Sequence, residues 1–271
     1  MQFRYVQAID GGVTEVIMSE KKLVVIGATS AIAQSCVKLL VNDEYRDVAL
    51  VGRNITALQA IAQDLRVLAS ATSLSVSCFE LSDFFSPIKI ERLAQKICSE
   101  KCPDMVLIAH GSSAVSNHEL TSDLEKLKSS LELNAISPVI FVEAFVSRLQ
   151  LVKKGHIVVI GSVAGDRGRN SNYVYGSGKS LLEKYLQGVR HRFALSKTNV
   201  CITLVKPGPT LTPMTADLQG VRPLADVETV ARCIFRGMKK RKSIIYAPAK
   251  WKIIMNVIRL IPDIVFNKLN I

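Results

Sequence analysis

Short apolar runs alternate with longer amphipathic stretches along most of this chain. Such short runs are typical of strands buried on both faces, whereas the stretches between them repeat their apolar residues at the helical period. This alternation predicts a doubly wound α/β architecture, in which a parallel sheet carries helices on both faces. The predicted strands are Leu23–Gly27, Val48–Val51, Leu74–Phe79, Met105–Ala109, His156–Gly161 and Val200–Val205, and the predicted helices cover residues 32–41, 55–69, 89–101, 122–150 and 174–196.

The length of the chain fits one such domain. Its 271 residues, 48% apolar and 21% charged, suffice for a substantial core and argue against disorder. No linker, repeat or low-complexity tract divides the sequence. We therefore expect a single Rossmann-type domain over residues 18–271. Residues 1–17 show no clear period, and we expect them to form a mobile extension.

The cysteines and the hydropathy pattern limit the compartment and the metal chemistry. Six cysteines are scattered along the chain, and Cys98 and Cys102 lack the histidine or second cysteine pair of a metal set. We therefore expect no metal site, and reduced thiols as in the cytoplasm. We find no signal peptide and no uninterrupted apolar run of about 18 residues, so no membrane span is predicted.

Positive charge is concentrated near the C-terminal end. The net charge is +12, and residues 239–271 hold eight basic side chains against one acid, Asp263. This density predicts an anionic partner, either lipid headgroups or a phosphorylated substrate. Nucleic acid is the least favoured partner, because the basic residues lie on an apolar tail without interleaved aromatic side chains.

The same tail has the pattern of an amphipathic helix that Pro262 ends. The apolar residues on one face of this helix are Ile253, Ile254, Val257, Ile258 and Ile261. A basic amphipathic segment over 250–271 suits peripheral contact with the inner face of a membrane. It equally suits a cap over a substrate pocket or a subunit interface.

Three polar residues form a candidate catalytic group. Tyr175 and Lys179 are four residues apart, so they share one face of a helix, and Ser162 follows the preceding strand. A free phenol has a pKa of roughly 10, which a nearby ammonium lowers toward neutrality, and a serine hydroxyl can hydrogen-bond a carbonyl oxygen. The group predicts acid–base chemistry on a C–O bond. The same spacing also occurs on solvated helix faces. The loops around these residues therefore decide between a catalytic group and a solvated face.

The loop after the first strand points to a dinucleotide. It reads Gly27-Ala28-Thr29-Ser30-Ala31-Ile32-Ala33 and opens a helix, the context in which backbone N–H groups bind a pyrophosphate. With the tyrosine, lysine and serine, residues 22–247 resemble the short-chain dehydrogenase/reductase family, although this loop keeps one of the family's three glycines. The resemblance implies cofactor contacts through Gly27, Thr29, Ser30, Ala31 and Ile32.

The ends of the next three strands resemble further cofactor positions of the family. Arg53, followed by Asn54, suits the 2′-phosphate of NADP(H), whereas an acidic residue there suits NAD; a solvated arginine is the alternative. Glu80-Leu81 stand where the family contacts adenine. Ala109-His110-Gly111 stand for its Asn-Ala-Gly, and His110 is either a contact to cofactor or substrate or a structural residue.

The resemblance implies the rest of the site. Asn134 matches an asparagine whose backbone carbonyl holds a water in a proton relay to Lys179. The loop after the sixth strand matches a turn that contacts the nicotinamide, with cofactor contacts at Pro207, Gly208, Thr210 and Thr212. The implied reaction is hydride transfer between NADP(H) and a ketone. Its catalytic residues are Asn134, Ser162, Tyr175 and Lys179.

The substrate is implied by a narrower similarity. The segment Gly161–Lys179 resembles the subgroup that contains decaprenylphosphoryl-2-keto-erythro-pentose reductase, which implies a keto-sugar or lipid-linked sugar of bacterial cell-surface polysaccharide synthesis. Arg167 and Arg169 are candidates for a substrate phosphate, or solvated loop residues. The alternatives are a 3-oxoacyl or steroid/retinoid-type carbonyl reductase and a non-catalytic NADP(H)-sensing protein. The family also implies a homodimer or homotetramer.

Overall fold

The predicted parallel sheet is present in the computed structural model, which describes residues 4–9, 12–17, 20–70, 73–113, 116–215 and 224–269. Seven parallel strands lie in the order β5-β4-β3-β6-β7-β8-β9. Their bounds are β3 (Lys21–Ile26), β4 (Tyr45–Gly52), β5 (Ser75–Glu80), β6 (Met105–Ile108), β7 (Lys154–Ile160), β8 (Asn199–Pro207) and β9 (Ile244–Ala247). The strand order reverses between β3 and β6, the position at which such sheets bind ligands.

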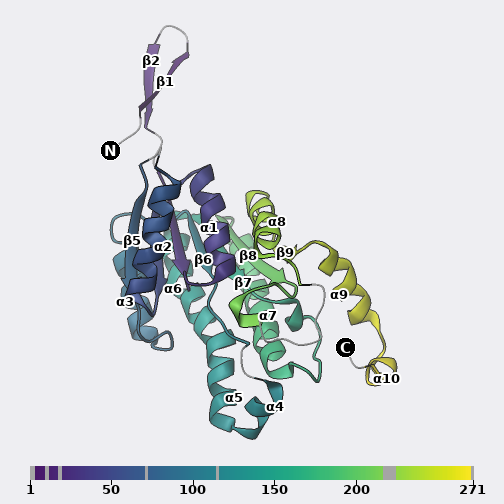
Figure 1. The fold of residues 1–271 in the computed structure, drawn as a ribbon. Helices are drawn as coiled ribbons and strands as arrows, with labels where there is room; N and C mark the ends of the chain where they lie inside the picture. Colours follow the sequence, from purple (N-terminus) through teal and green to yellow (C-terminus); the bar gives the residue numbers. More distant parts are fainter. Residues whose placement is uncertain are drawn as a thin grey trace.

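Helices cover both faces of the sheet, because successive strand residues point to opposite sides. On β3, Leu23 and Val25 enter one buried cluster and Val24 and Ile26 the other. The first cluster packs under α1 (Ala31–Asp43), α2 (Ile55–Leu68) and α8 (Val227–Lys239). The second packs under α3 (Pro87–Cys98), α6 (Ser137–Val152) and α7 (Tyr173–Leu195), as Figure 1 shows. The single-sheet α/β prediction is therefore confirmed.

The helix predicted over 122–150 is interrupted by a π-helical turn. The short α4 (Asn117–Ser122) is followed by α5 (Leu124–Leu131), the π turn Glu132–Ile136, and α6. By length and composition, residues 124–152 form one helix that could cross a membrane. Half of its apolar window is buried, and α6 contributes Phe141 and Phe145 to the core beneath the sheet, as the core helix of a globular domain does.

The sequence patterns missed several elements. The strand β9 was not predicted, because its apolar run Ile244–Ala247 is only four residues long. The helix α8 was also not predicted. Near the N-terminus, β1 (Arg4–Ile9) and β2 (Gly12–Ile17) pair as an antiparallel hairpin that lies outside the helical layers in Figure 1. The mobility that we expect for residues 1–17 stays a prediction.

The C-terminal helices lie against two loops at the carboxyl edge of the sheet. The helix α9 (Lys250–Leu260) ends before Pro262, as predicted, and α10 (Asp263–Phe266) follows. A Cβ atom on Gly208 would lie 1.9 Å from Nε1 of Trp251, so only glycine admits this contact. Met255 is buried, whereas much of the predicted apolar face is exposed. Its exposed members are Ile253, Ile254 and Val257, which Leu260 extends.

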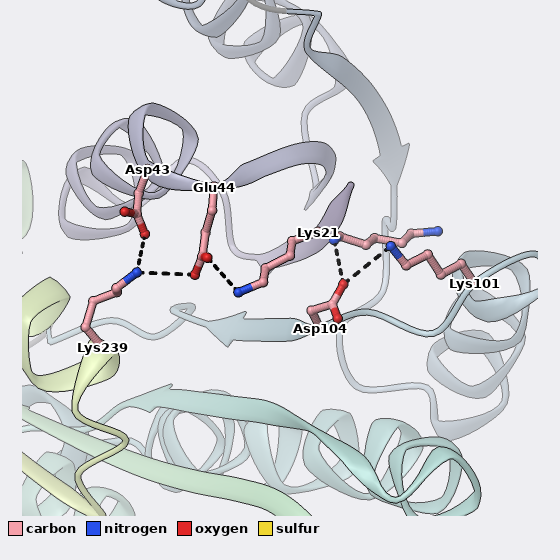
Figure 2. Close-up of polar contacts among 7 residues, drawn as sticks. Lys21, Asp43, Glu44, Lys101, Asp104 and Lys239 are labelled. Carbon is pink, nitrogen blue, oxygen red and sulfur yellow. Dashed lines mark hydrogen bonds and ion pairs between the residues drawn. The ribbon is translucent and has the colours of Figure 1, made fainter. Parts of the chain in front are cut away.

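Ion pairs close the opposite edge of the sheet, where the strands begin (Figure 2). Lys239 at the end of α8 contacts Asp43 at 2.7 Å and Glu44 at 3.4 Å, while Lys21 contacts Glu44 at 2.6 Å. These contacts join α1, α8 and β3. Because the partners are partly exposed, each pair contributes about 1 kcal/mol or less. The apolar clusters therefore dominate the stability of the fold.

Candidate active site

A cavity of about 1390 Å³ lies at the carboxyl ends of the strands, where the strand order reverses. Pockets for small ligands usually occupy about 300–1,000 Å³, so this cavity has room for a dinucleotide and a second molecule. Most of the predicted site residues line it. These are Gly27, Thr29, Ser30, Ala31, Ile32, Arg53, Ala109, His110, Gly111, Ser162, Arg169, Tyr175, Lys179, Pro207, Gly208, Thr210 and Thr212.

Five predicted residues do not line the cavity. Asn54 caps α2, its Oδ1 accepting from the Ala57 N–H at 3.0 Å. Glu80 ends β5 and points outward, and Leu81 is buried in the core; Ser82, Asp83, Phe84 and Phe85 line the cavity instead. Arg167 contacts the C-terminal helices, and Asn134 lies behind the cavity wall.

The loop after β3 forms the start of a dinucleotide cradle. Gly27 has φ +79°, and a Cβ atom there would lie 2.7 Å from the backbone nitrogen of His110, so the close approach of the two loops requires glycine. Ser30 caps α1, accepting from the Ala33 N–H at 3.4 Å. The positive end of α1 therefore opens into the cavity, where Arg53 adds a cationic side chain; this donor set fits a phosphorylated dinucleotide.

Ser162, Tyr175 and Lys179 converge on one wall of this cavity. Ser162 follows β7 and caps a short turn, accepting from the Ala164 N–H at 3.1 Å. Tyr175 and Lys179 lie one turn apart on α7. The Lys179 Nζ atom donates to the Ile160 carbonyl at 3.4 Å and lies 5.5 Å from the centroid of the Tyr175 ring. The loop after β7 thus brings Ser162 to the same wall as the two side chains of α7.

The protonation of this group differs from the sequence-based expectation. Burial raises the pKa of Tyr175 to about 12, and a hydrogen bond with Ser162 acts in the opposite direction. Burial also lowers the pKa of Lys179 to about 8. The expected lowering of the Tyr175 pKa by Lys179 is therefore wrong for this geometry, because loss of water around the phenol outweighs the distant ammonium. Near neutral pH the tyrosine is a protonated donor.

Asn134 holds the loop after β6 against Lys179. It is 1% exposed and lies in the π turn, a feature that recurs at functional sites. Its Oδ1 accepts from the Ser112 N–H at 3.0 Å, and its Nδ2 donates to the Ser112 carbonyl at 2.8 Å. A Cβ atom on Gly111 would lie 2.9 Å from this Oδ1 and 3.1 Å from the Lys179 Nζ. The predicted water relay through the Asn134 carbonyl stays a prediction.

His110 joins three segments beneath the cavity. Its Nε2 lies 2.9 Å from the Ser137 Oγ, which itself donates to the Phe84 carbonyl at 2.6 Å. Since the serine proton is used there, Nε2 carries the imidazole proton. The rings of Phe84 and Phe141 pack at 5.0 and 5.2 Å from the imidazole. Burial, followed by the charges of Lys179 and Arg53, lowers the His110 pKa to about 3, so this side chain is neutral.

A buried charge network, which the sequence reading missed, supports the site. Lys206 is 1% exposed and forms ion pairs with Asp166 and, at 2.8 Å, with Glu183. Tyr246 donates to Asp166 at 3.0 Å. Burial alone would lower the Lys206 pKa, but the two carboxylates outweigh it and raise that pKa. A lysine within the apolar run before Pro207 was the available signal.

The network connects three parts of the site. Asp166 follows Ser162 by four residues, Glu183 lies one turn beyond Lys179 on α7, and Lys206 precedes the Pro207–Gly208 turn. We predict that Lys206→Met destabilises the protein by about 3–5 kcal/mol, because it leaves the Asp166 carboxylate buried without a cation. Urea unfolding measures this loss.

The matched control is the double variant Lys206→Met with Asp166→Asn, which removes both buried charges. It should regain a large part of the lost free energy of unfolding, since no uncompensated carboxylate remains at the Asp166 position. A single variant as stable as the parent protein would contradict the structural role of the network.

Known proteins resemble this chain in sequence and in fold. Residues 21–221 match the family model for short chain dehydrogenases. An uncharacterized oxidoreductase of Staphylococcus epidermidis is 27% identical over 218 residues, which cover 80% of this chain and 90% of that protein.

Among solved structures, a Burkholderia cenocepacia short chain dehydrogenase in complex with NADP has a TM-score of 0.72 at 17% identity, covering 90% of this chain and all of that one. A Comamonas testosteroni alcohol dehydrogenase specific for bulky-bulky ketones has a TM-score of 0.73 at 17% identity, with 90% and 95% covered. These similarities support the fold, while the family model spans most of the chain. The chain therefore belongs to the short-chain dehydrogenase family.

Proposed function

We propose that this protein is an NADP(H)-dependent oxidoreductase that reduces a ketone to an alcohol. The observation that carries the proposal is that Ser162, Tyr175 and Lys179 line the same cavity as the loop at Gly27 and the side chain of Arg53. An acid–base group beside a dinucleotide cradle has the parts that hydride transfer to a carbonyl requires. Hydride transfer needs both the bound dinucleotide and the acid–base group.

The residues of the cavity fit the cofactor. The N-terminus of α1 would hold the pyrophosphate, Arg53 the 2′-phosphate, and Lys179 with Thr212 the nicotinamide end. NADP is the ligand of the similar Burkholderia structure. When bound, the cofactor supplies a hydride to the carbonyl carbon.

The side chains of this chain supply the proton and the polarisation. Tyr175, protonated at neutral pH because its pKa is about 12, donates its proton to the oxygen that becomes the alcohol. Ser162 donates a hydrogen bond to the same oxygen and so stabilises negative charge as it forms. Lys179 and the loop held by Asn134 lie behind the phenol, where the ammonium acts against the larger effect of burial and stabilises the phenolate that forms when the proton leaves.

The substrate that we propose is a keto-sugar or a lipid-linked keto-sugar of bacterial cell-surface polysaccharide synthesis, reduced in the cytoplasm. The support is the size of the cavity and the subgroup similarity of Gly161–Lys179. Specificity of the Comamonas enzyme for bulky ketones is compatible with this substrate class. A 3-oxoacyl or steroid/retinoid-type ketone is the alternative. A purely NADP(H)-sensing role has less support, because sensing has no use for Ser162 and Tyr175.

We also propose that α9 and α10 contact the inner face of an anionic membrane. Both apolar and basic groups are exposed there: Val257, Leu260 and Ile264 are 59%, 82% and 79% exposed, and Lys252 and Arg259 flank them. Burial of apolar side chains in the headgroup region, combined with attraction of the basic residues to anionic lipid, stabilises such contact. A lipid-linked substrate would be available at the same surface.

The oligomeric state that we propose is a homodimer or homotetramer. Five apolar residues of α7, at 181, 182, 185, 186 and 189, suit either packing between subunits or packing on the sheet, and Leu182, Leu186 and Val189 are buried against the sheet of their own chain. Leu181 is 41% exposed, and Tyr185 is half-buried and donates to Glu143 on α6. Of these five positions, Leu181 and Tyr185 are the two that remain for contact with another subunit.

Replacing Tyr175 by Phe should abolish turnover. We expect kcat for ketone reduction to fall by about 10³-fold, within the usual range for loss of a general acid, with little change in NADPH affinity. Stopped assays of alcohol formation and NADPH fluorescence titration measure the two effects. Tyr173→Phe, at the exposed first residue of α7 and two positions before Tyr175, is the matched control and should keep full activity. A Tyr175→Phe enzyme with near-parental kcat would refute the assignment.

The reductive kcat/KM should fall as pH rises through about 8. Burial lowers the Lys179 pKa to about 8, so its ammonium form is lost above that pH, whereas Tyr175, with a pKa of about 12, stays protonated. A pH profile with saturating NADPH, checked for cofactor binding at each pH, measures this. A profile that is level to about pH 10 would show that the charge on Lys179 is not required.

Vesicle flotation tests the membrane contact. The parent protein should float with phosphatidylglycerol vesicles, less so with phosphatidylcholine vesicles or at high salt. A triple variant of Val257, Leu260 and Ile264 to Ser should lose flotation. Leu151→Ser, at an 83% exposed position on α6, is the control. Equal flotation of parent and triple variant would exclude the contact, and a changed oligomeric state of the variant would point to a subunit interface.

A further inference from the structure

Two arginines on the loop that follows Ser162 have opposite surroundings. Arg167 is fully engaged: its guanidinium donates to the carbonyls of Ile258 and Ile261, pairs with Asp263 at 2.7 Å, and stacks on the Phe266 ring at 3.8 Å. These contacts hold α9 and α10 to the loop. Arg167 therefore has no free donor set for a substrate phosphate, and with its side chain 13% exposed it is not a solvated loop residue either.

Arg169, two residues further on, lines the cavity without a partner. Its Nε atom is buried, and within residues 20–70, 73–113, 116–215 and 224–269 no side chain or carbonyl accepts a hydrogen bond from its guanidinium. Burial lowers the pKa of Arg169, with no neighbouring carboxylate opposing the effect. Because a partly buried, unpaired cation is costly in free energy, an anion from outside the chain would stabilise this arrangement.

The acidic residues near the cavity are engaged elsewhere. Asp83 accepts from the Phe85 N–H at 2.9 Å, Glu228 pairs with Arg232 at 3.2 Å, and Asp166 belongs to the Lys206 network. Arg53 lines the cavity too, but as part of the dinucleotide cradle. Among the described residues, Arg169 is thus the cavity arginine left over once the cofactor is assigned.

A second unsatisfied group lies on the same loop. Asn172 lines the cavity three residues before Tyr175, and its Oδ1 is buried without a hydrogen-bond partner in the described part of the chain. Asn117 fixes this segment, because its side chain donates to the Asn170 carbonyl and accepts from the Val174 N–H, each at 3.2 Å. An amide oxygen suits a hydroxyl donor, whereas a guanidinium suits a phosphate.

We propose that Arg169 and Asn172 form the subsite for a phosphate-bearing, hydroxylated part of the ketone substrate, with the phosphate on Arg169 and a hydroxyl on Asn172. This rests on the proposed ketone reduction and narrows its substrate class to keto-sugar phosphates, either monoesters or lipid phosphodiesters. The phosphate takes no part in the chemistry. The ketone gains a hydride from NADPH and a proton from Tyr175, and NADP⁺ and the alcohol leave.

The kinetic test compares a ketone with and without phosphate. With NADPH saturating, kcat/KM is measured for dihydroxyacetone, for dihydroxyacetone phosphate, and for a farnesyl phosphodiester of a ketopentose. The parent enzyme should prefer the phosphorylated ketones. In Arg169→Gln the ratio of phosphorylated to neutral kcat/KM should fall by about 10- to 100-fold, Arg169→Lys should restore part of it, and Arg167→Gln should leave the ratio unchanged. Preference for the monoester or the diester separates a free sugar phosphate from a lipid-linked one.

A binding test remains decisive if no ketone is reduced. Inorganic phosphate is titrated into the NADPH complex, where the cofactor's own 2′-phosphate occupies Arg53. Phosphate should raise the Tm of the parent protein by about 2–4 °C, and Arg169→Gln should abolish this rise while its own Tm is no lower than that of the parent, since an unpaired buried charge is removed.

The outcomes separate the two proposals. A phosphate effect that depends on Arg169, without reduction of any ketone, would keep the subsite and refute the proposed function. Ketone reduction with an unchanged ratio in Arg169→Gln, or an equal rise of Tm in parent and variant, would overturn the subsite alone.

Discussion

Burial of both faces of the sheet is the constraint on which the other features depend. The central strands contribute fully buried residues to both clusters, so their interior offers no place for an exposed polar group. The exceptions are paired within the sheet, as His156 is with Thr203 at 2.7 Å. Chemistry is therefore confined to the loops at the strand ends, and these loops meet where the strand order reverses.

The buried charged and polar groups that support the site have partners within the chain, whereas two groups that line the cavity do not. Lys206 has two carboxylates, and Arg167 has carbonyls, a carboxylate and an aromatic ring. The side-chain amide of Asn134 accepts from the Ser112 N–H and donates to the Ser112 carbonyl. Arg169 and Asn172 lack such partners in the described structure, and both line the cavity. Groups left unsatisfied beside a fully satisfied network are those expected to contact a ligand.

The positions of the C-terminal helices join the exposed apolar surface to the chemistry. Trp251 packs on Gly208 in the loop after β8, and Arg167 ties α9 and α10 to the loop that carries Ser162. A partner bound to the exposed face of α9 would therefore lie next to the helix that contacts two cavity loops, one after β8 and one that carries Ser162. The same packing explains why α9 buries Met255 and leaves Val257 and Ile253 exposed. The helix α9 does carry the predicted apolar residues, but it packs on the domain through Met255 and leaves Ile253, Ile254 and Val257 exposed.

The sequence by itself determined the parallel sheet, six of its seven strands and the loops that line the cavity, because apolar periodicity and glycine-bearing strand ends are local signals. Only the tertiary structure decided the state of each group. Burial, which depends on distant segments, raised the Tyr175 pKa where spacing to Lys179 had suggested a decrease. Likewise Arg167 and Arg169 are equivalent in sequence, and packing of residues about 90 positions away engages one and leaves the other free.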